Sequence, residues 1–273
     1  MRGDDRGPIG VFDSGVGGLS VVREIRARYP KADILYFGDT ARVPYGNKSA
    51  DTVIRYSIEI ADFLVKRGIS TLVVACNTSS ALALDTLKER MSIPVLGVIA
   101  PGARGGLRAT RNGNIGLIGT RATVGSGAYA KELRSLDPSV RLHAAACPLF
   151  VPLVEEGWSD DPVAEEVARR YLGRLLEIGI DTLILGCTHY PALMGSLQRV
   201  VGNGVTLVSS AREAAAALED GIPRNEGRGI DGTGTLRVFV SDTGTHFQRV
   251  GESLLAAPVP LLRKIEEERL VSP

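Results

Sequence analysis

The chain repeats one of its own segments, and this repeat constrains the fold more than any other feature. Residues 68–78 read GISTLVVACNT and residues 179–189 read GIDTLILGCTH, so Cys187 follows Cys76 by 111 residues. Each copy is a β-branched and Leu-rich run that ends in a small residue, a cysteine and two polar residues. Such a run predicts a buried parallel strand with a thiol at its carboxyl end. Ligands bind at that end of open α/β sheets, so the repeat predicts two thiols facing one small substrate.

The repeat extends beyond the cysteine segments. Residues 7–14, GPIGVFDS, align with residues 113–120, GNIGLIGT, at a similar offset of 106 residues. A repeating unit of roughly a hundred residues has the size of a domain and not of a solenoid unit. We therefore expect an α/β fold of two pseudo-symmetric doubly wound domains, with the active site in the cleft between them.

The domain boundaries are expected where the second strand-helix series begins and ends. We predict a first domain of residues 1–98 plus 210–273 and a second domain of residues 99–209. An extra strand pattern at residues 236–240 suggests that the C-terminal segment returns to the first domain. Three other segments are predicted as a loop (147–157), an exposed loop (222–235) and a short terminal helix or frayed end (261–271).

Composition excludes several classes of function. The net charge of the 273 residues is only +1, so neither nucleic acid nor a membrane surface is expected as a partner. Three cysteines without a CxxC or Cys/His spacing predict neither a disulfide framework nor a zinc site. The sequence shows no signal peptide and no apolar run of membrane-spanning length. We expect reduced thiols in a cytoplasmic protein, without a metal.

Two thiols at equivalent positions suit one particular reaction. Inversion of the α-carbon of an amino acid removes a proton from one face of a planar intermediate and returns a proton to the other face. One base cannot reach both faces, so two acid/base groups are needed. A thiol, with an unperturbed pKa of roughly 8.5, can take up and release protons near neutrality. A lone cysteine is more often a small buried apolar residue, but the equivalence of Cys76 and Cys187 favours a catalytic pair.

The residues near the two cysteines break the symmetry of the repeat. Asp13 ends the first strand, where it could assist a thiol, bind a substrate ammonium group or cap the next helix. Its repeat counterpart is Gly119. His189 corresponds to Thr78, and it could stabilise a thiolate, relay protons or serve only the structure. The two thiols are therefore expected to have different helper groups.

Other polar residues carry weaker signals. Asn77 and Thr188 stand beside the cysteines at strand-helix junctions, where they suit carboxylate binding or helix capping. The loop of residues 15–18 is neither a dinucleotide-binding nor a Walker motif, but its glycines allow backbone N–H groups to approach a small anion. Glu155 and Glu156 are adjacent, and residue chemistry alone selects neither. Three further residues are read as structural or as background: Cys147, which has no evident repeat partner, His143 and His246.

Four motifs together resemble bacterial glutamate racemases. They are DSGVGGL at residues 13–19, DTARVPYG at 39–46, ACNTSS at 75–80 and GCTHYP at 186–191. The resemblance covers about residues 8–260. It implies membership of the cofactor-independent aspartate/glutamate racemase superfamily, in which two α/β domains enclose the active site.

The resemblance also implies roles for individual residues. Cys76 is expected to act as the acid/base toward D-glutamate and Cys187 toward L-glutamate. Asp13 and His189 match the auxiliary acid/base residues, and the context CPLFVPLVE assigns the third auxiliary role to Glu155. The substrate-binding positions expected from the resemblance are Asp13, Ser14, Pro44, Tyr45, Gly46, Asn77, Thr78, Thr188 and His189.

The implied function is the interconversion of L- and D-glutamate without a cofactor. In the family D-glutamate serves cytoplasmic peptidoglycan synthesis, which maintains the cell wall and cell shape, and homodimers are common. Three alternatives remain open from the residues. They are a related racemase acting on aspartate or a hydantoin, a hydrolase with one nucleophilic cysteine such as Cys187 beside His189, and a non-catalytic protein that binds acidic amino acids.

Overall fold

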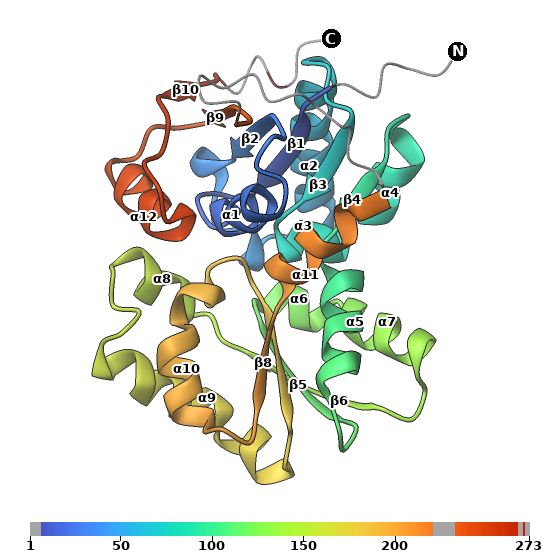
Figure 1. Ribbon diagram of the computed structural model, residues 1–273, viewed down its shortest axis with the longest axis vertical. Helices are drawn as coiled ribbons and strands as arrows, with labels where there is room; N and C mark the ends of the chain where they lie inside the picture. Colours follow the sequence, from blue (N-terminus) through green and yellow to red (C-terminus); the bar gives the residue numbers. More distant parts are fainter. Residues whose placement is uncertain (1–6, 221–232, 267–269, 271–273) are drawn as a thin grey trace.

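The computed structural model describes residues 7–220, 233–266 and 270, and it contains two parallel β-sheets (Figure 1). The six-stranded sheet has the order β10-β9-β2-β1-β3-β4 and belongs to the first domain. The four-stranded sheet has the order β6-β5-β7-β8 and belongs to the second domain. Helices flank both sheets, so the prediction of a two-domain α/β fold is confirmed.

The elements of the first domain follow the expected alternation. Its strands are β1 (Ile9–Asp13), β2 (Ile34–Gly38), β3 (Thr71–Val74), β4 (Val95–Gly97), β9 (Leu236–Val240) and β10 (Leu262–Lys264). Its helices are α1 (Leu19–Arg28), η1 (Thr40–Arg42), η2 (Tyr45–Asn47), α2 (Ala50–Val65), α3 (Asn77–Leu82), α4 (Leu84–Arg90) and α12 (Thr245–Leu255).

The second domain repeats the same series. Its strands are β5 (Asn114–Gly119), β6 (Arg141–Ala146), β7 (Thr182–Gly186) and β8 (Thr206–Ser209). Its helices are α5 (Ile99–Ala109), α6 (Arg121–Gly125), α7 (Ala128–Leu136), α8 (Phe150–Glu155), α9 (Pro162–Ile178), η3 (Tyr190–Leu193) and α10 (Met194–Val201). Two further elements, α11 (Ser210–Ala216) and η4 (Ala217–Asp220), follow β8.

The sequence repeat is also a repeat of strand pairing. In the first sheet β1 pairs with β3 so that Ile9 lies opposite Thr71. In the second sheet β5 pairs with β7 so that Ile115 lies opposite Thr182. These partners are the residues that the two sequence offsets superpose, and the order β2-β1-β3-β4 corresponds to β6-β5-β7-β8. The two sequence offsets therefore relate the register of the central pair β1 and β3 to that of the central pair β5 and β7.

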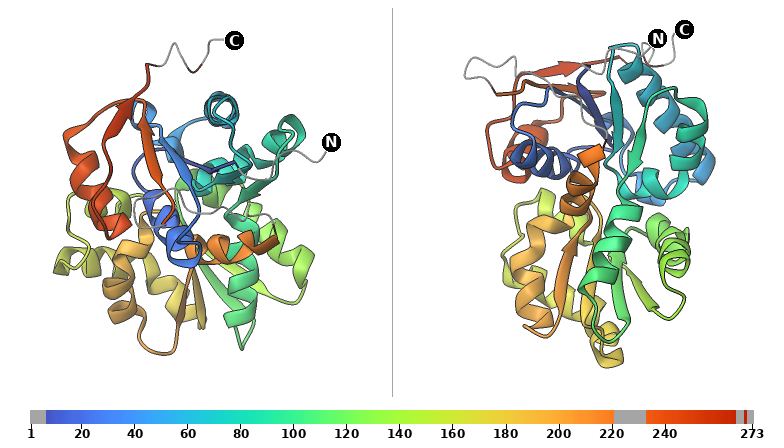
Figure 2. Two further views of the ribbon diagram at one scale, coloured as in Figure 1. Left: turned by 45° about the horizontal axis from the view of Figure 1, so that its top comes forward. Right: turned by 45° about the vertical axis from the view of Figure 1, so that its right-hand side comes forward.

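The C-terminal strands extend the first sheet. β9 pairs in parallel with β2, and β10 pairs with β9. Between β8 and these strands, α11 lies at the junction of the two domains, where it contacts α1 and α5 (Figure 2). The predicted return of the chain to the first sheet is observed, whereas the boundaries at residues 98 and 209 stay predictions.

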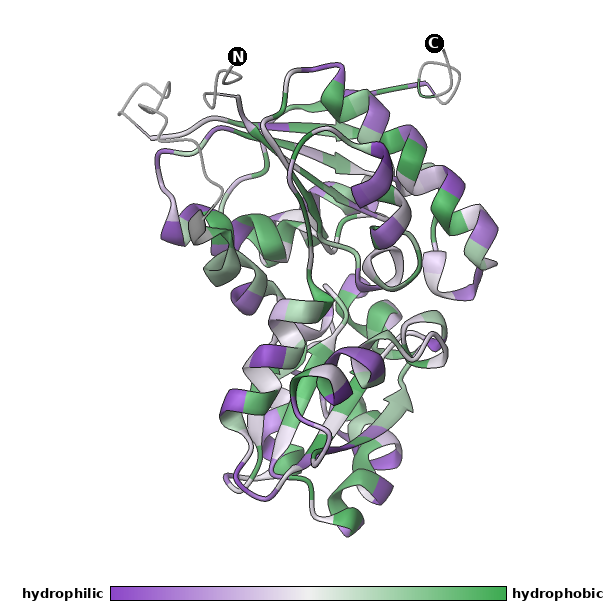
Figure 3. Cartoon of the chain, turned by 90° about the vertical axis from the view of Figure 1, so that its right-hand side faces the viewer, coloured by the Kyte–Doolittle hydropathy of each residue, from purple (hydrophilic) through white to green (hydrophobic). Residues whose placement is uncertain are grey.

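Amphipathic helices cover the apolar strands. β1, β3 and β7 are buried along their whole length, as continuous apolar runs in parallel sheets should be. Coloured by hydropathy, the outer helices alternate hydrophilic and hydrophobic residues along their length (Figure 3). No helix in the described ranges has the length and apolar character needed to cross a membrane.

Three local predictions differ from the structure or fall outside it. The segment 147–157 was predicted as a loop but contains α8, because Pro152 lies in the first turn, where a missing N–H costs little. The tail after residue 261 was predicted as helical or frayed, but it contributes strand β10 through pairing with β9. Of the predicted exposed loop 222–235, residues 222–232 lie outside the described residues.

Candidate active site

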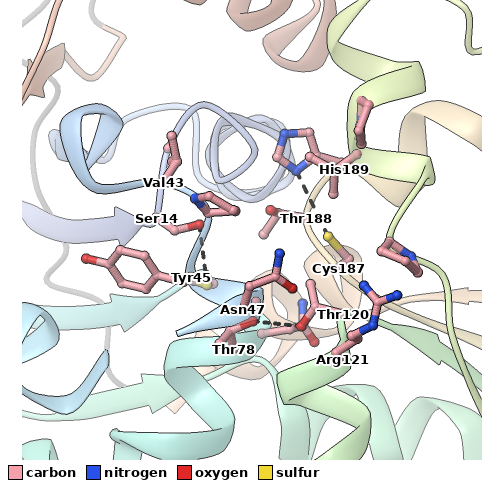
Figure 4. Close-up of a pocket in the computed structure, with 18 of the residues that line it drawn as sticks. Ser14, Val43, Tyr45, Asn47, Thr78, Thr120, Arg121, Cys187, Thr188 and His189 are labelled. Atoms are coloured by element: carbon pink, nitrogen blue, oxygen red, sulfur yellow. Dashed lines mark hydrogen bonds between the residues drawn. The ribbon is translucent and has the colours of Figure 1, made fainter. Parts of the chain in front are cut away.

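The two repeated cysteines line one cavity of about 320 Å³. Cys76 follows β3 and Cys187 follows β7, so each thiol lies just beyond the carboxyl end of a central strand. Both side chains are buried, with exposed fractions of 5% and 6%. Figure 4 shows the side chains that surround this cavity. The central prediction, that the repeat delivers two thiols to one site, agrees with this geometry.

Both domains contribute to the cavity wall. The residues from the first domain are Ser14, Gly15, Val43, Pro44, Tyr45, Gly46, Asn47, Cys76, Asn77 and Thr78. The residues from the second domain are Thr120, Arg121, Pro148, Val151, Pro152, Glu155, Cys187, Thr188 and His189. Every predicted site residue except Asp13 is in this set.

Cys76 has neutral hydrogen-bonding partners. It is the N-cap residue of α3, and its Sγ accepts a hydrogen bond from the backbone N–H of Ser79 at 3.5 Å. The thiol donates to Ser14 Oγ at 3.7 Å. Burial and the nearby charge of Asp13 raise the pKa of Cys76 to about 11, although the bonds to Ser79 and Ser14 oppose this shift. Cys76 is therefore a protonated thiol near neutral pH.

Cys187 has an ionisable partner instead. His189 Nδ1 lies 4.0 Å from Cys187 Sγ, and its Nε2 lies 3.1 Å from Oε1 of the half-buried Glu155. Burial lowers the pKa of His189, but the interactions with Cys187 and Glu155 outweigh burial and raise it to about 10. The hydrogen bond from His189 lowers the pKa of Glu155. A cationic imidazole beside Cys187 stabilises negative charge on the sulfur.

Asp13 lies behind the cavity wall. Its carboxylate is fully buried and accepts hydrogen bonds from Gly15 N–H at 3.0 Å and from Thr188 Oγ1 at 3.3 Å. Burial raises the pKa of Asp13, and the charge of His189 opposes this rise. Backbone hydrogen bonds from Gly15 and Gly18, directly before α1, also lower the pKa of Asp13, so the helix-capping alternative stays open. Its role as an auxiliary acid/base stays a prediction. In this conformation Asp13 could influence the cavity only through neighbours such as Thr188.

The glycine loop before α1 allows the two domains to come close together. A Cβ atom on Gly17 would lie 2.3 Å from Thr188 Oγ1 and 2.6 Å from the ring of His189, so only glycine fits. Ser20 Oγ donates to the backbone carbonyl of Thr188 at 2.7 Å across the same contact. The sequence suggested that these glycines admit a small anion. Gly15 does line the cavity, but Gly17 serves the packing between domains.

Hydroxyl and amide groups from both domains meet at the base of the site. Thr78 Oγ1 lies 2.9 Å from Thr120 Oγ1 and 3.3 Å from Thr123 Oγ1. The Asn77 amide donates to Ser210 Oγ at 3.3 Å and accepts from the Tyr129 hydroxyl at 2.8 Å. These bonds orient side chains at positions where the resemblance predicts substrate binding.

Several lining residues were not selected from the sequence. Thr120 occupies the position that the 106-residue offset assigns to Ser14, so the repeat contained a signal for it. Arg121, at the exposed side of the cavity, had no such signal.

Cys147 has a counterpart after all, contrary to the sequence reading. Its backbone N–H donates to Gly119 O after β6, as the N–H of Asp39 donates to Asp13 O after β2. Cys147 is buried but does not line the cavity. Among residues 7–220 and 233–266, no group of three or more His, Cys, Asp or Glu side chains is placed to hold a metal ion.

Comparison with known proteins identifies the class to which this fold and site belong. The family model for Asp/Glu/hydantoin racemases matches residues 18–218, and the chain belongs to that family. The chain is 53% identical to the glutamate racemase of Geobacter metallireducens over 248 residues, which cover 90% of this chain and 92% of the relative. The resemblance predicted from the four motifs is thereby confirmed.

Solved structures of glutamate racemases have the same fold. The Thermus thermophilus enzyme, in complex with β-chloro-D-alanine, superposes with a TM-score of 0.86 at 46% identity and covers 97% of this chain and 99% of its own. The Francisella tularensis enzyme, in complex with D-glutamate, gives a TM-score of 0.87 at 35% identity and covers 96% and 98% of the two chains.

Proposed function

We propose that this chain interconverts L-glutamate and D-glutamate by proton transfer between two thiols, without a cofactor. The observation that carries the proposal is that Cys76 and Cys187 line the same cavity from equivalent strands of two domains. The hydroxyl and amide side chains that line the cavity, such as those of Ser14, Asn77 and Thr188, can donate hydrogen bonds to the carboxylate groups of an amino acid. Relatives at up to 53% identity that act on glutamate support this choice of substrate.

The different surroundings of the two thiols suggest different roles for them. Burial and the charge of Asp13 keep Cys76 protonated, since they raise its pKa to about 11. Cys187 lies beside the imidazole of His189, which is cationic at neutral pH because its pKa is raised to about 10. Cys76 is then the proton donor, and the imidazolium of His189 is placed to stabilise negative charge on Cys187 when that thiol loses its proton.

This arrangement suits the conversion of L-glutamate to D-glutamate. The Cys187 thiolate removes the α-proton of L-glutamate, and the electron pair of the C–H bond stays on the planar carbanion. Cys76 then donates its proton to the opposite face, which yields D-glutamate, a neutral Cys187 thiol and a Cys76 thiolate. The reverse reaction starts with a neutral Cys187 thiol and a Cys76 thiolate. Before another L-glutamate is converted, Cys187 must therefore lose its proton and Cys76 must regain one. His189 and Glu155 are the groups best placed to stabilise the charge on Cys187.

Solvent isotope incorporation tests the proposal directly. The chain is incubated with L-glutamate in D₂O, and circular dichroism follows the inversion while NMR follows deuterium at the α-carbon. We expect loss of optical rotation together with deuterium in the D-product. A non-catalytic binding protein would give neither signal, and a hydrolase would give a trappable acyl-enzyme. Parallel assays with aspartate and a hydantoin distinguish the related racemases.

The setting of the reaction is part of the same proposal. D-Glutamate made by this chain would serve peptidoglycan synthesis in the cytoplasm, and glutamate is the expected small-molecule partner. A homodimer is the expected assembly, and sedimentation equilibrium measures it. Neither a nucleic acid nor a membrane is expected to bind, in keeping with a net charge of only +1.

A further inference from the structure

One wall of the cavity consists of a segment that no sheet holds in place. Residues 43–47, which follow η1 and include η2, all line the cavity from the first domain. They precede α2 and take no part in strand pairing. Tyr45 in this wall is buried, with an exposed fraction of 1%. Other contacts must therefore hold this wall at the distance that a substrate requires.

The buried carboxylate of Asp39 supplies these contacts. Asp39 has an exposed fraction of 0%, and its Oδ2 accepts a hydrogen bond from the Tyr45 hydroxyl. Arg42 Nε donates to both carboxylate oxygens, at 2.8 and 3.0 Å. Ser241, which directly follows β9, donates to Oδ1 at 2.8 Å. Two groups from the neighbouring segment and one from the end of β9 thus converge on one carboxylate.

The Tyr45 hydroxyl faces away from the other labelled side chains of the site (Figure 4). Burial and the charge of Asp39 raise the pKa of Tyr45, so the phenol remains a hydrogen-bond donor over the whole working range of pH. The phenol group of Tyr45 therefore anchors the wall, and it is the ring and the backbone that line the cavity.

Arg42 connects the same carboxylate to α2. Its Nη1 donates to Glu59, and its guanidinium group lies 4.0 Å from the ring centre of Tyr56. The rings of Tyr56 and Tyr45 are themselves 5.8 Å apart. The wall is held on one side by α2 and on the other side by the end of β9. Removal of one of these contacts leaves the others in place, so a single substitution should loosen the wall without unfolding it.

We propose that Asp39 is a positioning residue for substrate binding, which holds residues 43–47 against the cavity through Tyr45 and is itself held by Ser241. The inference rests on the proposed function. It gives the C-terminal strand β9 a role in the site, because Ser241 acts on the cavity wall although it lies outside the cavity lining. The hydrogen bonds of Cys76 and Cys187 in the described part of the chain go to other residues than those of this network.

Such a network affects binding more than chemistry. If a weakened network leaves the wall in its binding-competent position for only a fraction of the time, the apparent KM rises by the reciprocal of that fraction. At saturating substrate the bound state is restored, and kcat stays near its original value because both thiols are unchanged. A residue with a purely structural role would lower the Tm and leave KM as it was.

Two conservative variants and a matched control test the proposal. Tyr45→Phe removes the phenol hydroxyl, and Ser241→Ala removes the serine hydroxyl. Ser57→Ala is the control, because Ser57 is a buried serine of α2 whose Oγ has no hydrogen-bond partner in the described structure. Steady-state rates with L- and D-glutamate give kcat and KM, and thermal unfolding gives the Tm of each variant.

We expect KM to rise about 3- to 10-fold in Tyr45→Phe and about 2- to 5-fold in Ser241→Ala, with kcat within about twofold of the original enzyme. Ser57→Ala should match the original enzyme in both constants. Unchanged KM in both test variants of an active enzyme would overturn the role of Asp39, whatever their Tm. An unsubstituted chain that fails to racemise glutamate would instead overturn the proposed function and this inference with it.

Discussion

The two halves of the molecule place their thiols alike but surround them differently. The strand pairing that positions Cys76 in the first sheet recurs for Cys187 in the second. Around Cys76 the partners are the backbone of Ser79 and a serine hydroxyl. Around Cys187 a histidine and a glutamate form a chain of ionisable groups. The repeat thus conserves geometry, while the chemistry of each half is set by residues that depart from the repeat.

The largest expected effect comes from removing either thiol. Cys76→Ala and Cys187→Ala should each lower the racemisation rate by about 10³-fold or more, because each loses one of two acid/base groups. The remaining thiol can still exchange a proton on its own face. In D₂O, Cys76→Ala should label L-glutamate and Cys187→Ala should label D-glutamate, both without inversion.

Cys147→Ala is the matched control for both thiol variants, since Cys147 is buried outside the cavity lining. It should retain racemisation. Full racemisation by either active-site variant would rule out the two-thiol mechanism, and labelling of the opposite enantiomers would reverse the assignment of the faces.

His189 should matter less than the thiol that it assists. His189→Asn removes the cation beside Cys187 and should lower kcat/KM about 10²-fold. The kcat/KM for L-glutamate and the kcat/KM for D-glutamate must stay equal, because the equilibrium constant between the enantiomers is one. Both values therefore fall together. His143→Asn, on β6 and outside the cavity lining, is the control and should keep its activity. Equal losses in both variants would indicate a general effect on folding.

Substitution of Glu155 should lower activity less than substitution of His189. The same substitution at the adjacent Glu156 is the control. Glu155→Gln should lower kcat/KM about 10-fold and Glu156→Gln should leave it unchanged, because only Glu155 reaches His189. Glu155 helps to raise the pKa of His189, so its loss lowers that pKa. The alkaline limb of the pH–rate profile should then move to lower pH in Glu155→Gln. A shift of the same size in Glu156→Gln would contradict this assignment.

The last expected effect is on stability and not on activity. The pKa of His189 rises from 6.5 in the unfolded chain to about 10 in the folded one, so the folded state binds more protons between these values. The stabilisation from His189 is complete below pH 6.5 and is lost as the pH rises toward 10. The Tm of the original chain should fall across this window more steeply than that of His189→Asn. Parallel curves from thermal unfolding would contradict the prediction.

The fold could be inferred from the sequence because strand pairing and sequence repeat obey the same offsets. Continuous apolar runs predict buried parallel strands, and the two offsets relate the pairing of β1 with β3 to the pairing of β5 with β7. The segment before Glu155 was misread as a loop because prolines in the first turn of a helix resemble those of a loop. That error matters for the site, since α8 presents Glu155 to His189 and leaves Glu156 exposed.

The site was predictable where residues follow strand ends and less so elsewhere. Both thiols and the polar residues after them were found by position, whereas Asp13 was expected at the cavity and lies behind its wall. A strand end indicates which edge of the sheet a residue occupies, but packing between domains decides whether its side chain reaches the cavity. Thr188, whose hydroxyl donates a hydrogen bond to the Asp13 carboxylate, comes from the other domain.

The pairing of β9 with β2 also has a consequence for the order in which the protein is made. All strands of the second sheet lie within residues 114–209, so that sheet can form while the ribosome still holds the end of the chain. The first sheet cannot be completed then, because β2 remains an open edge until residues 236–240 emerge. The nascent chain therefore acquires both thiols early, and it acquires the hydroxyl of Ser241 that anchors the binding wall only near the end of synthesis.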